Sequence, residues 1–141
     1  MRLTEQSRYA LRVLAHCAER HPALAKVATI ADVTGITEQN IFKLIKALTK
    51  AGLVQTIRGP HGGVRLAMAP GAIRVGQVIR SIEPRFQACG PLDQMLSEEP
   101  VGAIDRELDR TIGLGIAAFM ETLDRTSIAA LIAKTSPANA A

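Results

Sequence analysis

Residues 26–66 of the chain read KVATIADVTGITEQNIFKLIKALTKAGLVQTIRGPHGGVRL. An apolar-periodic segment ends at Gly35, and a second begins two residues later at Thr37. The hydroxyl of a threonine at this position can accept a hydrogen bond from an unpaired N–H group of the first helical turn. The stretch therefore predicts a helix, a tight turn and a second helix.

The second predicted helix, residues 37–50, has one apolar stripe. Ile41, Leu44, Ile45 and Leu48 follow the i, i+3, i+4, i+7 spacing of a helix that buries one side. The polar and charged residues keep to the other sides of the helix. We therefore expect the apolar side to face a core and the opposite side to face solvent or a ligand.

The polar side of this helix carries groups suited to DNA recognition. The amide side chains of Gln39 and Asn40 can pair with adenine, and Lys43 can reach guanine or a phosphate. An ordinary solvated helix would carry the same residue types, so this segment alone leaves both interpretations open.

A glycine-rich turn then joins two short β-type runs, residues 53–57 and 64–66. Glycines let the backbone approach a duplex closely. Arg58 and Arg65 flank the turn, and guanidinium groups suit phosphates or a narrow minor groove. Together with the two helices, this hairpin predicts a winged helix-turn-helix.

The length and composition of the chain predict one domain with an aliphatic core. The 141 residues are 48% hydrophobic and include no Trp. We expect a cytoplasmic protein, because no signal peptide or membrane-length apolar run is visible.

Cys17 and Cys89 are the only cysteines, which is too few for a disulfide scaffold, and Cys17 lies on the apolar side of a predicted helix. Cys17 is therefore interpreted as a small buried hydrophobic residue.

Charge is divided unevenly along the sequence. Residues 1–90 hold 13 Lys and Arg against 5 Asp and Glu, whereas residues 91–141 hold 4 against 8. The first part therefore carries a net charge of +8 and favours a polyanionic partner. Basic surface alone would also suit RNA or an acidic membrane.

The overall prediction is a mostly α-helical protein, with a small two-stranded wing and a long C-terminal dimerisation helix. Further helices are expected at residues 3–20, 75–82, 101–124 and 127–134. The expected parts are a winged helix-turn-helix domain at 1–83, a sensor-type loop at 84–100, the dimerisation and terminal helices at 101–134, and a flexible tail at 135–141.

The helix at residues 101–124 would be roughly 36 Å long, which exceeds what a compact body of this size needs for its own core. Such a helix suits a two-fold dimer, and a bent internal helix is the alternative. Gly113 and Gly115 each cost about 1 kcal/mol in a helix interior, which close backbone contact would explain.

Several motifs together carry a family resemblance. They are Met1-Arg2-Leu3-Thr4, Tyr9-Ala10-Leu11-Arg12, Ile30-Ala31, the wing Arg58-Gly59-Pro60-His61-Gly62-Gly63, and Val78 with Glu83. Over nearly the whole chain the sequence resembles the bacterial IscR/NsrR/RirA/CymR family of winged-helix regulators. The resemblance implies a homodimer formed through the long helix on a palindromic operator. It also implies that residues 37–50 enter the major groove and residues 58–65 the minor groove.

We therefore expect a dimeric, sequence-specific DNA-binding transcriptional regulator that acts as a repressor. No nucleophile–base set, metal-ligand spacing or phosphate loop is visible, so an enzyme is not expected. The alternative is a winged-helix protein-interaction module without specific DNA readout. The expected DNA contacts are Arg2, Thr37, Glu38, Gln39, Asn40, Lys43, Lys46, Arg58, Gly59, His61, Gly62, Gly63 and Arg65.

The resemblance also raises the question of a sensor. Many relatives sense iron, nitric oxide or redox state through an iron–sulfur cluster that three loop cysteines hold, and Cys89 occupies the place of the first. Met95 and Val101 stand near the positions of the other two, and Arg8 stands where some relatives use an acidic ligand. A cluster is disfavoured, because clusters normally need four thiolates or thiolates with histidine.

Three interpretations of sensing remain open. A cluster could combine Cys89 with Asp93, Glu98, Glu99 or a histidine, although carboxylates are poor substitutes for thiolates. Cys89 could instead be a lone redox-reactive thiol. The protein could also have lost the cluster and respond to a small molecule, to a protein partner or to no signal. Iron and acid-labile sulfide per monomer, measured on protein purified without oxygen, distinguish the first interpretation from the others.

Overall fold

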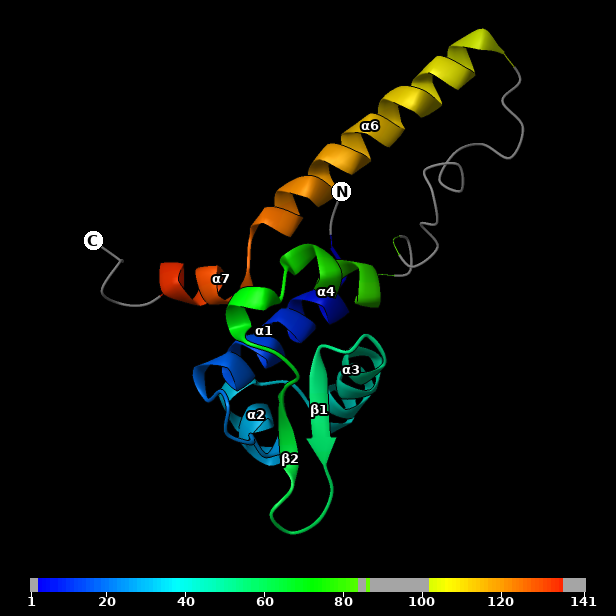
Figure 1. The fold of residues 1–141 in the computed structure, drawn as a ribbon. Coiled ribbons are helices and arrows are strands. Elements are labelled where there is room, and N and C mark those ends of the chain that lie inside the picture. The colour runs from blue at the N-terminus through cyan, green and yellow to red at the C-terminus, as the bar shows by residue number, and fades with distance from the viewer. Residues whose placement is uncertain (1–2, 84–85, 87–101, 136–141) are drawn as a thin grey trace.

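The computed structural model describes residues 3–83, 86 and 102–135. Its elements are α1 (Glu5–Glu19), α2 (Val27–Thr34), α3 (Glu38–Lys50), β1 (Val54–Ile57), β2 (Gly63–Leu66), the 3-10 turn η1 (Pro70–Ala72), α4 (Val75–Ile82), α6 (Ala103–Arg125) and α7 (Ile128–Thr135). Figure 1 shows that α6 projects from one end of a helical body and that the β1–β2 hairpin lies at the other end. The predicted mostly α-helical winged fold is confirmed.

The helix-turn-helix forms where the sequence predicts it. Gly35 follows α2 with a left-handed φ of 70°, and its N–H donates to the carbonyl oxygen of Ala31 over 2.9 Å. Glycine adopts this conformation without the penalty that a Cβ would cause. Thr37 then caps α3, because its Oγ1 accepts the N–H of Asn40 over 3.4 Å.

The main core lies between α1, α3 and the hairpin. It is aliphatic, as the composition predicts, and its α1 and α3 members are Ala10, Val13, Leu14, Cys17, Ile41, Leu44, Ile45 and Leu48. Cys17 is completely buried, and burial raises the pKa of its thiol to about 11. The interpretation of Cys17 as a buried hydrophobic residue agrees with this packing.

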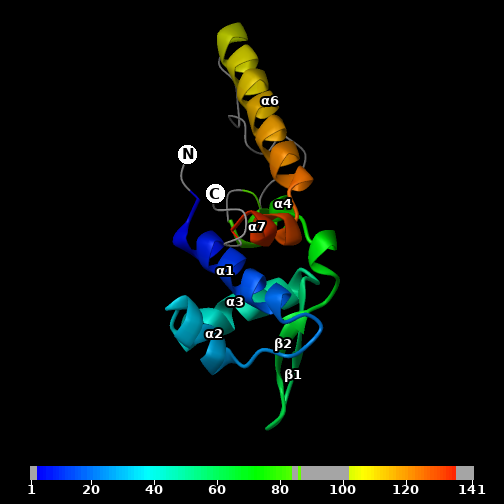
Figure 2. The same ribbon diagram turned by 90° about the vertical axis from the view of Figure 1, so that its left-hand side faces the viewer.

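The wing is an antiparallel pair whose register runs from Val54 opposite Leu66 to Ile57 opposite Gly63. A third segment braces it, because Ala25 and Val64 exchange two backbone hydrogen bonds of 2.8 and 2.9 Å. The hairpin is thereby fixed to the chain that leads into α2. Figure 2 shows the hairpin extending beyond α2 and α3, away from α6.

The C-terminal helices differ slightly from the predicted ranges. The long helix begins at Ala103 and ends at Arg125, one residue beyond the predicted end. The sequence prediction placed residue 135 in the flexible tail, but α7 includes Thr135, whose Oγ1 donates to the carbonyl oxygen of Ile132 over 3.0 Å. Ile128 of α7 is buried in the main core, so the chain returns to the body after α6.

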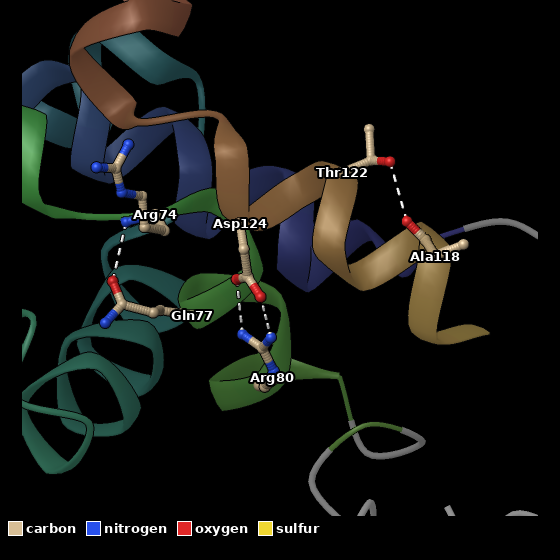
Figure 3. Close-up of polar contacts among 6 residues, drawn as sticks. All are labelled: Arg74, Gln77, Arg80, Ala118, Thr122 and Asp124. Carbon is tan, nitrogen blue, oxygen red and sulfur yellow. Dashed lines mark hydrogen bonds and ion pairs between the residues drawn. The ribbon is translucent and has the colours of Figure 1, made fainter. Parts of the chain in front are cut away.

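The junction of α4 and α6 is held by an ion pair (Figure 3). The guanidinium of Arg80 donates to both carboxylate oxygens of Asp124, with Nη1 at 2.9 Å from Oδ1. The hydrogen bond from Arg80 lowers the pKa of Asp124. Gly76 is buried beside this pair, and a Cβ there would overlap Asp124 Oδ1. A larger residue at position 76 would therefore have to displace this carboxylate.

A buried carboxylate ties the end of α4 to the start of α1. Glu83 is 2% exposed. Its Oε1 accepts hydrogen bonds from the Thr4 N–H at 2.6 Å, the Thr4 hydroxyl at 3.0 Å and the Ser7 hydroxyl at 2.7 Å. Because the Ser7 side chain is itself buried, this carboxylate satisfies a donor that water does not reach.

Replacing Glu83 should therefore weaken the fold. We expect Glu83→Ala to lower the free energy of unfolding by roughly 1–3 kcal/mol, because it leaves the buried Ser7 hydroxyl without this acceptor. Urea denaturation at fixed protein concentration measures the change. Glu121→Ala is the control, since Glu121 pairs with Arg125 on an exposed part of α6 and such pairs contribute little. Equal losses in the two variants would contradict the role assigned to Glu83.

Candidate nucleic-acid interface

The outer side of α3 is exposed because its inner side is fixed in the core. Glu38, Gln39, Lys43 and Lys46 are exposed, and Asn40 is half-buried. Thr37 is exposed as well, while its hydroxyl caps the helix. The amide and ammonium groups predicted to meet DNA are therefore presented together along one helix.

The tip of the wing is a tight turn that depends on glycine. Gly59 has a left-handed φ of 110°, and its carbonyl oxygen accepts the N–H of Gly62 over 2.9 Å. A Cβ at Gly62 would overlap the carbonyl oxygen of Ile57. Arg58 and His61 are exposed on this turn. The tip thus presents backbone groups, the Arg58 guanidinium and the His61 imidazole.

Two predicted contacts lie farther back on β2. Gly63 faces the body, where a Cβ would come within 2.6 Å of the Ala25 carbonyl oxygen. Arg65 is half-buried and donates from Nη2 to Gln55 Oε1 over 3.4 Å, across the strand pair. This contact aligns the guanidinium along the sheet, and its remaining N–H groups can still donate.

A hollow of about 570 Å³ separates α3 from the wing. Its lining residues are Lys26, Val27, Phe42, Ile45, Thr56, Ile57, Arg58, Gly59, Gly62, Gly63 and Val64. Lys26 and Arg58 supply positive charge to it. Sequence reasoning missed Lys26 and Phe42 as site residues. The sequence offers one signal, the place of Phe42 off the apolar stripe, and the packing of the hairpin beside α3 is what brings both residues to this hollow.

The candidate interface lies at one end of the described structure. Figure 1 shows α2, α3 and the β1–β2 hairpin at the end opposite the projecting α6. Of the predicted site residues, Arg2 and Cys89 lie outside the described residues. The predicted sensor loop at 84–100 also lies outside them, apart from Phe86.

Two further properties concern the described part of the chain. Within residues 3–83, 86 and 102–135, no group of three or more His, Cys, Asp or Glu side chains is placed to hold a metal ion. None of the described helices combines the length and the apolar character that crossing a membrane requires.

Comparison with known proteins decides the family. The model of the Rrf2 family, described as an iron-dependent transcriptional regulator, matches residues 3–134. The chain belongs to the Rrf2 family of transcriptional regulators. The family resemblance inferred from the sequence is thereby confirmed. Rrf2 proteins are transcriptional regulators, which are typically not enzymes, and membership supports a DNA-binding regulator.

Individual Rrf2 relatives agree with this assignment. Protein aau3 of Rhizobium meliloti (strain 1021) is 36% identical over 138 residues, which cover 94% of this chain and 85% of that protein. The structure of CymR (YrzC), the global cysteine regulator of B. subtilis, matches with a TM-score of 0.75 and 30% identity, covering 96% of this chain and 99% of CymR. IscR of T. potens matches with a TM-score of 0.74 at 24% identity, covering 100% and 93% of the two chains, and supports the fold.

The wing turn generates a test of the interface. We expect Gly62→Ala to weaken binding to every duplex by roughly tenfold, because the displaced tip carries Arg58 away from the phosphates. Fluorescence anisotropy with labelled duplexes measures the affinity. Gly71→Ala is the matched control, since a Cβ at Gly71 meets nothing within 4 Å. If both variants kept wild-type affinity, the wing would not be part of the interface.

Proposed function

We propose that this regulator binds a palindromic operator as a homodimer, with α3 in the major groove and the wing in the minor groove. The observation that carries the proposal is the shared orientation of the two elements. α3 and the β1–β2 hairpin lie at the same end of the body, and α6 leaves from the opposite end (Figure 1). Phe42 of α3 and Arg58 of the wing tip line one hollow. A major groove is wide enough to admit such a helix.

In this arrangement some side chains recognise bases and others bind the phosphate backbone. Gln39 and Asn40 lie in the first turn of α3 and read base edges. Lys43, Lys46 and Arg58 bind phosphates, which fixes the register of the protein but carries little sequence information. A dimer placed in this way covers its operator and acts as a repressor by excluding other proteins from that DNA.

The proposed dimer is supported by the apolar side of α6. Ile104, Leu108 and Ile112, spaced by four residues, are 83%, 54% and 45% exposed. Gly115 continues this side, and a Cβ there would meet nothing within 4 Å. A row of large apolar side chains on a helix that projects from the body is unfavourable in water. A second copy of the same helix would cover it and would use the open space at Gly115.

For sensing, we propose that any redox response uses the thiol of Cys89. Cys17 is fully buried and its raised pKa, about 11, keeps it as an unreactive thiol. We assign no iron–sulfur cluster, because one loop thiol does not match the four-ligand sets that hold such clusters.

The DNA-binding proposal predicts a distinctive effect at the wing. We expect Arg58→Ala to weaken binding to specific and random duplexes alike and to reduce the slope of log affinity against log salt by about 1. The slope is measured by titration at several salt concentrations. Lys134→Ala at the end of α7 removes the same charge away from the interface and should leave both quantities unchanged.

Gln39→Ala provides the contrasting variant. It should change the preference between sequences while leaving the salt slope nearly intact, since an amide neutralises no phosphate. An unchanged affinity of Arg58→Ala for every duplex would contradict the docking model. A steep salt response without preference for any sequence would instead favour the protein-interaction alternative.

The dimer proposal predicts that one charge on the apolar side of α6 separates the subunits. We expect Leu108→Asp to be monomeric at micromolar concentration, because dimer formation would bury an unpaired carboxylate. Sedimentation velocity measures the mass. Leu114→Asp is the control, because Leu114 is also exposed but lies on a different side of the helix. A dimeric Leu108→Asp variant would exclude this side of α6 as the interface.

A further inference from the structure

The polar outer side of α3 is interrupted by one large apolar side chain. Phe42 is 56% exposed, although the core stripe of the helix runs through Ile41 and Leu44. Its exposed helical neighbours include Gln39 and Lys46. Phe42 therefore makes no contribution to the core that would explain its position, and it stands among the side chains assigned to the DNA.

Phe42 shares the lining of the hollow with both apolar and cationic side chains. It lines the hollow between α3 and the wing, and Ile57, 44% exposed at the end of β1, lines the same hollow. Lys26 and Arg58 also line it. A hollow that is lined by apolar side chains and by two cations fits a partner that combines negative charge with a small apolar group.

Duplex DNA has this combination. Its phosphates attract the cations, and the C5 methyl group of thymine is the apolar group that base edges present in the major groove. We propose that Phe42 contacts a thymine methyl group and thereby selects a T·A pair at one position of each half-site. This inference rests on the proposed docking of α3 in the major groove.

The contact adds a type of specificity that the polar residues of α3 do not supply. Gln39 and Asn40 recognise hydrogen-bonding groups, which uracil and thymine present identically. Phe42 senses only whether the methyl group is present. Replacing thymine by deoxyuridine removes that methyl group and keeps the pairing with adenine, so it isolates this contact.

The experiment begins with a duplex that the protein selects from a random pool. Each thymine is then replaced singly by deoxyuridine, and the affinity of the wild-type protein is measured. We expect one position per half-site at which the replacement weakens binding by about fourfold, the effect of losing one buried methyl group. This measurement needs no variant, so it does not depend on whether a variant folds.

Phe42→Ala then assigns the effect to the side chain. We expect this variant to bind the thymine and deoxyuridine duplexes equally well at that position. Val33→Ala is the matched control, because Val33 is an exposed apolar residue of α2 that does not line this hollow, and it should keep the fourfold difference.

The possible results distinguish a failure of the methyl contact from a failure of the proposed function. Selective binding with no deoxyuridine effect at any position would overturn the methyl contact and leave the proposed function intact. A deoxyuridine effect that persists in Phe42→Ala would also overturn the assignment to Phe42. Failure to select any duplex would remove the proposed function itself, and the methyl contact with it.

Discussion

The burial of one side of α3 is the constraint on which the interface depends. Ile41, Leu44, Ile45 and Leu48 are each at most 6% exposed, and together they fix the rotation of the helix about its axis. Because helical residues repeat every 3.6 positions, this rotation decides which side chains point outward. Ordering long polar side chains has an entropic cost, but the direction of the backbone that carries them is already set by the core.

The wing depends on the same core through a different route. Val64 is buried, and its backbone pairs with Ala25 just before α2. β2 is therefore attached to the segment that precedes α2 as well as to β1. A two-stranded hairpin alone is marginally stable in water, and this third segment gives it a fixed base. The hollow between α3 and the wing keeps its shape because both of its walls are anchored in one core.

Much of this arrangement was readable from the sequence, because local signals specify it. Gly35 and Thr37 mark the turn of the helix-turn-helix, and the glycines after Arg58 mark the wing. What the sequence could not give are contacts between distant segments. The three hydrogen bonds accepted by Glu83 join residues 76 to 79 positions apart, and no periodicity predicts such a pairing.

The candidate site shows the same division. The polar residues of α3 follow from helical spacing alone, whereas the hollow exists only once β1 and β2 pack beside that helix. Phe42 looked like an ordinary apolar residue in a sequence in which 48% of residues are hydrophobic. The role proposed for Phe42 depends on its exposure, and exposure is a property of the packed structure.

The limits of α6 and α7 also differ from the predicted limits by one or two residues, as is usual where the last turn of a helix frays.

The joint between α4 and α6 has a mechanical consequence. Arg80 holds the Asp124 carboxylate beside Gly76, so the base of α6 is tied to α4 at one point. A rigid arm of 23 residues is about 34 Å long. A tilt of about 10° at its base would move its far end by roughly 6 Å, which approaches the rise of two base pairs of DNA. In the proposed dimer, a side-chain adjustment at this joint would thus change the distance between the two DNA-binding ends by nearly two base-pair steps.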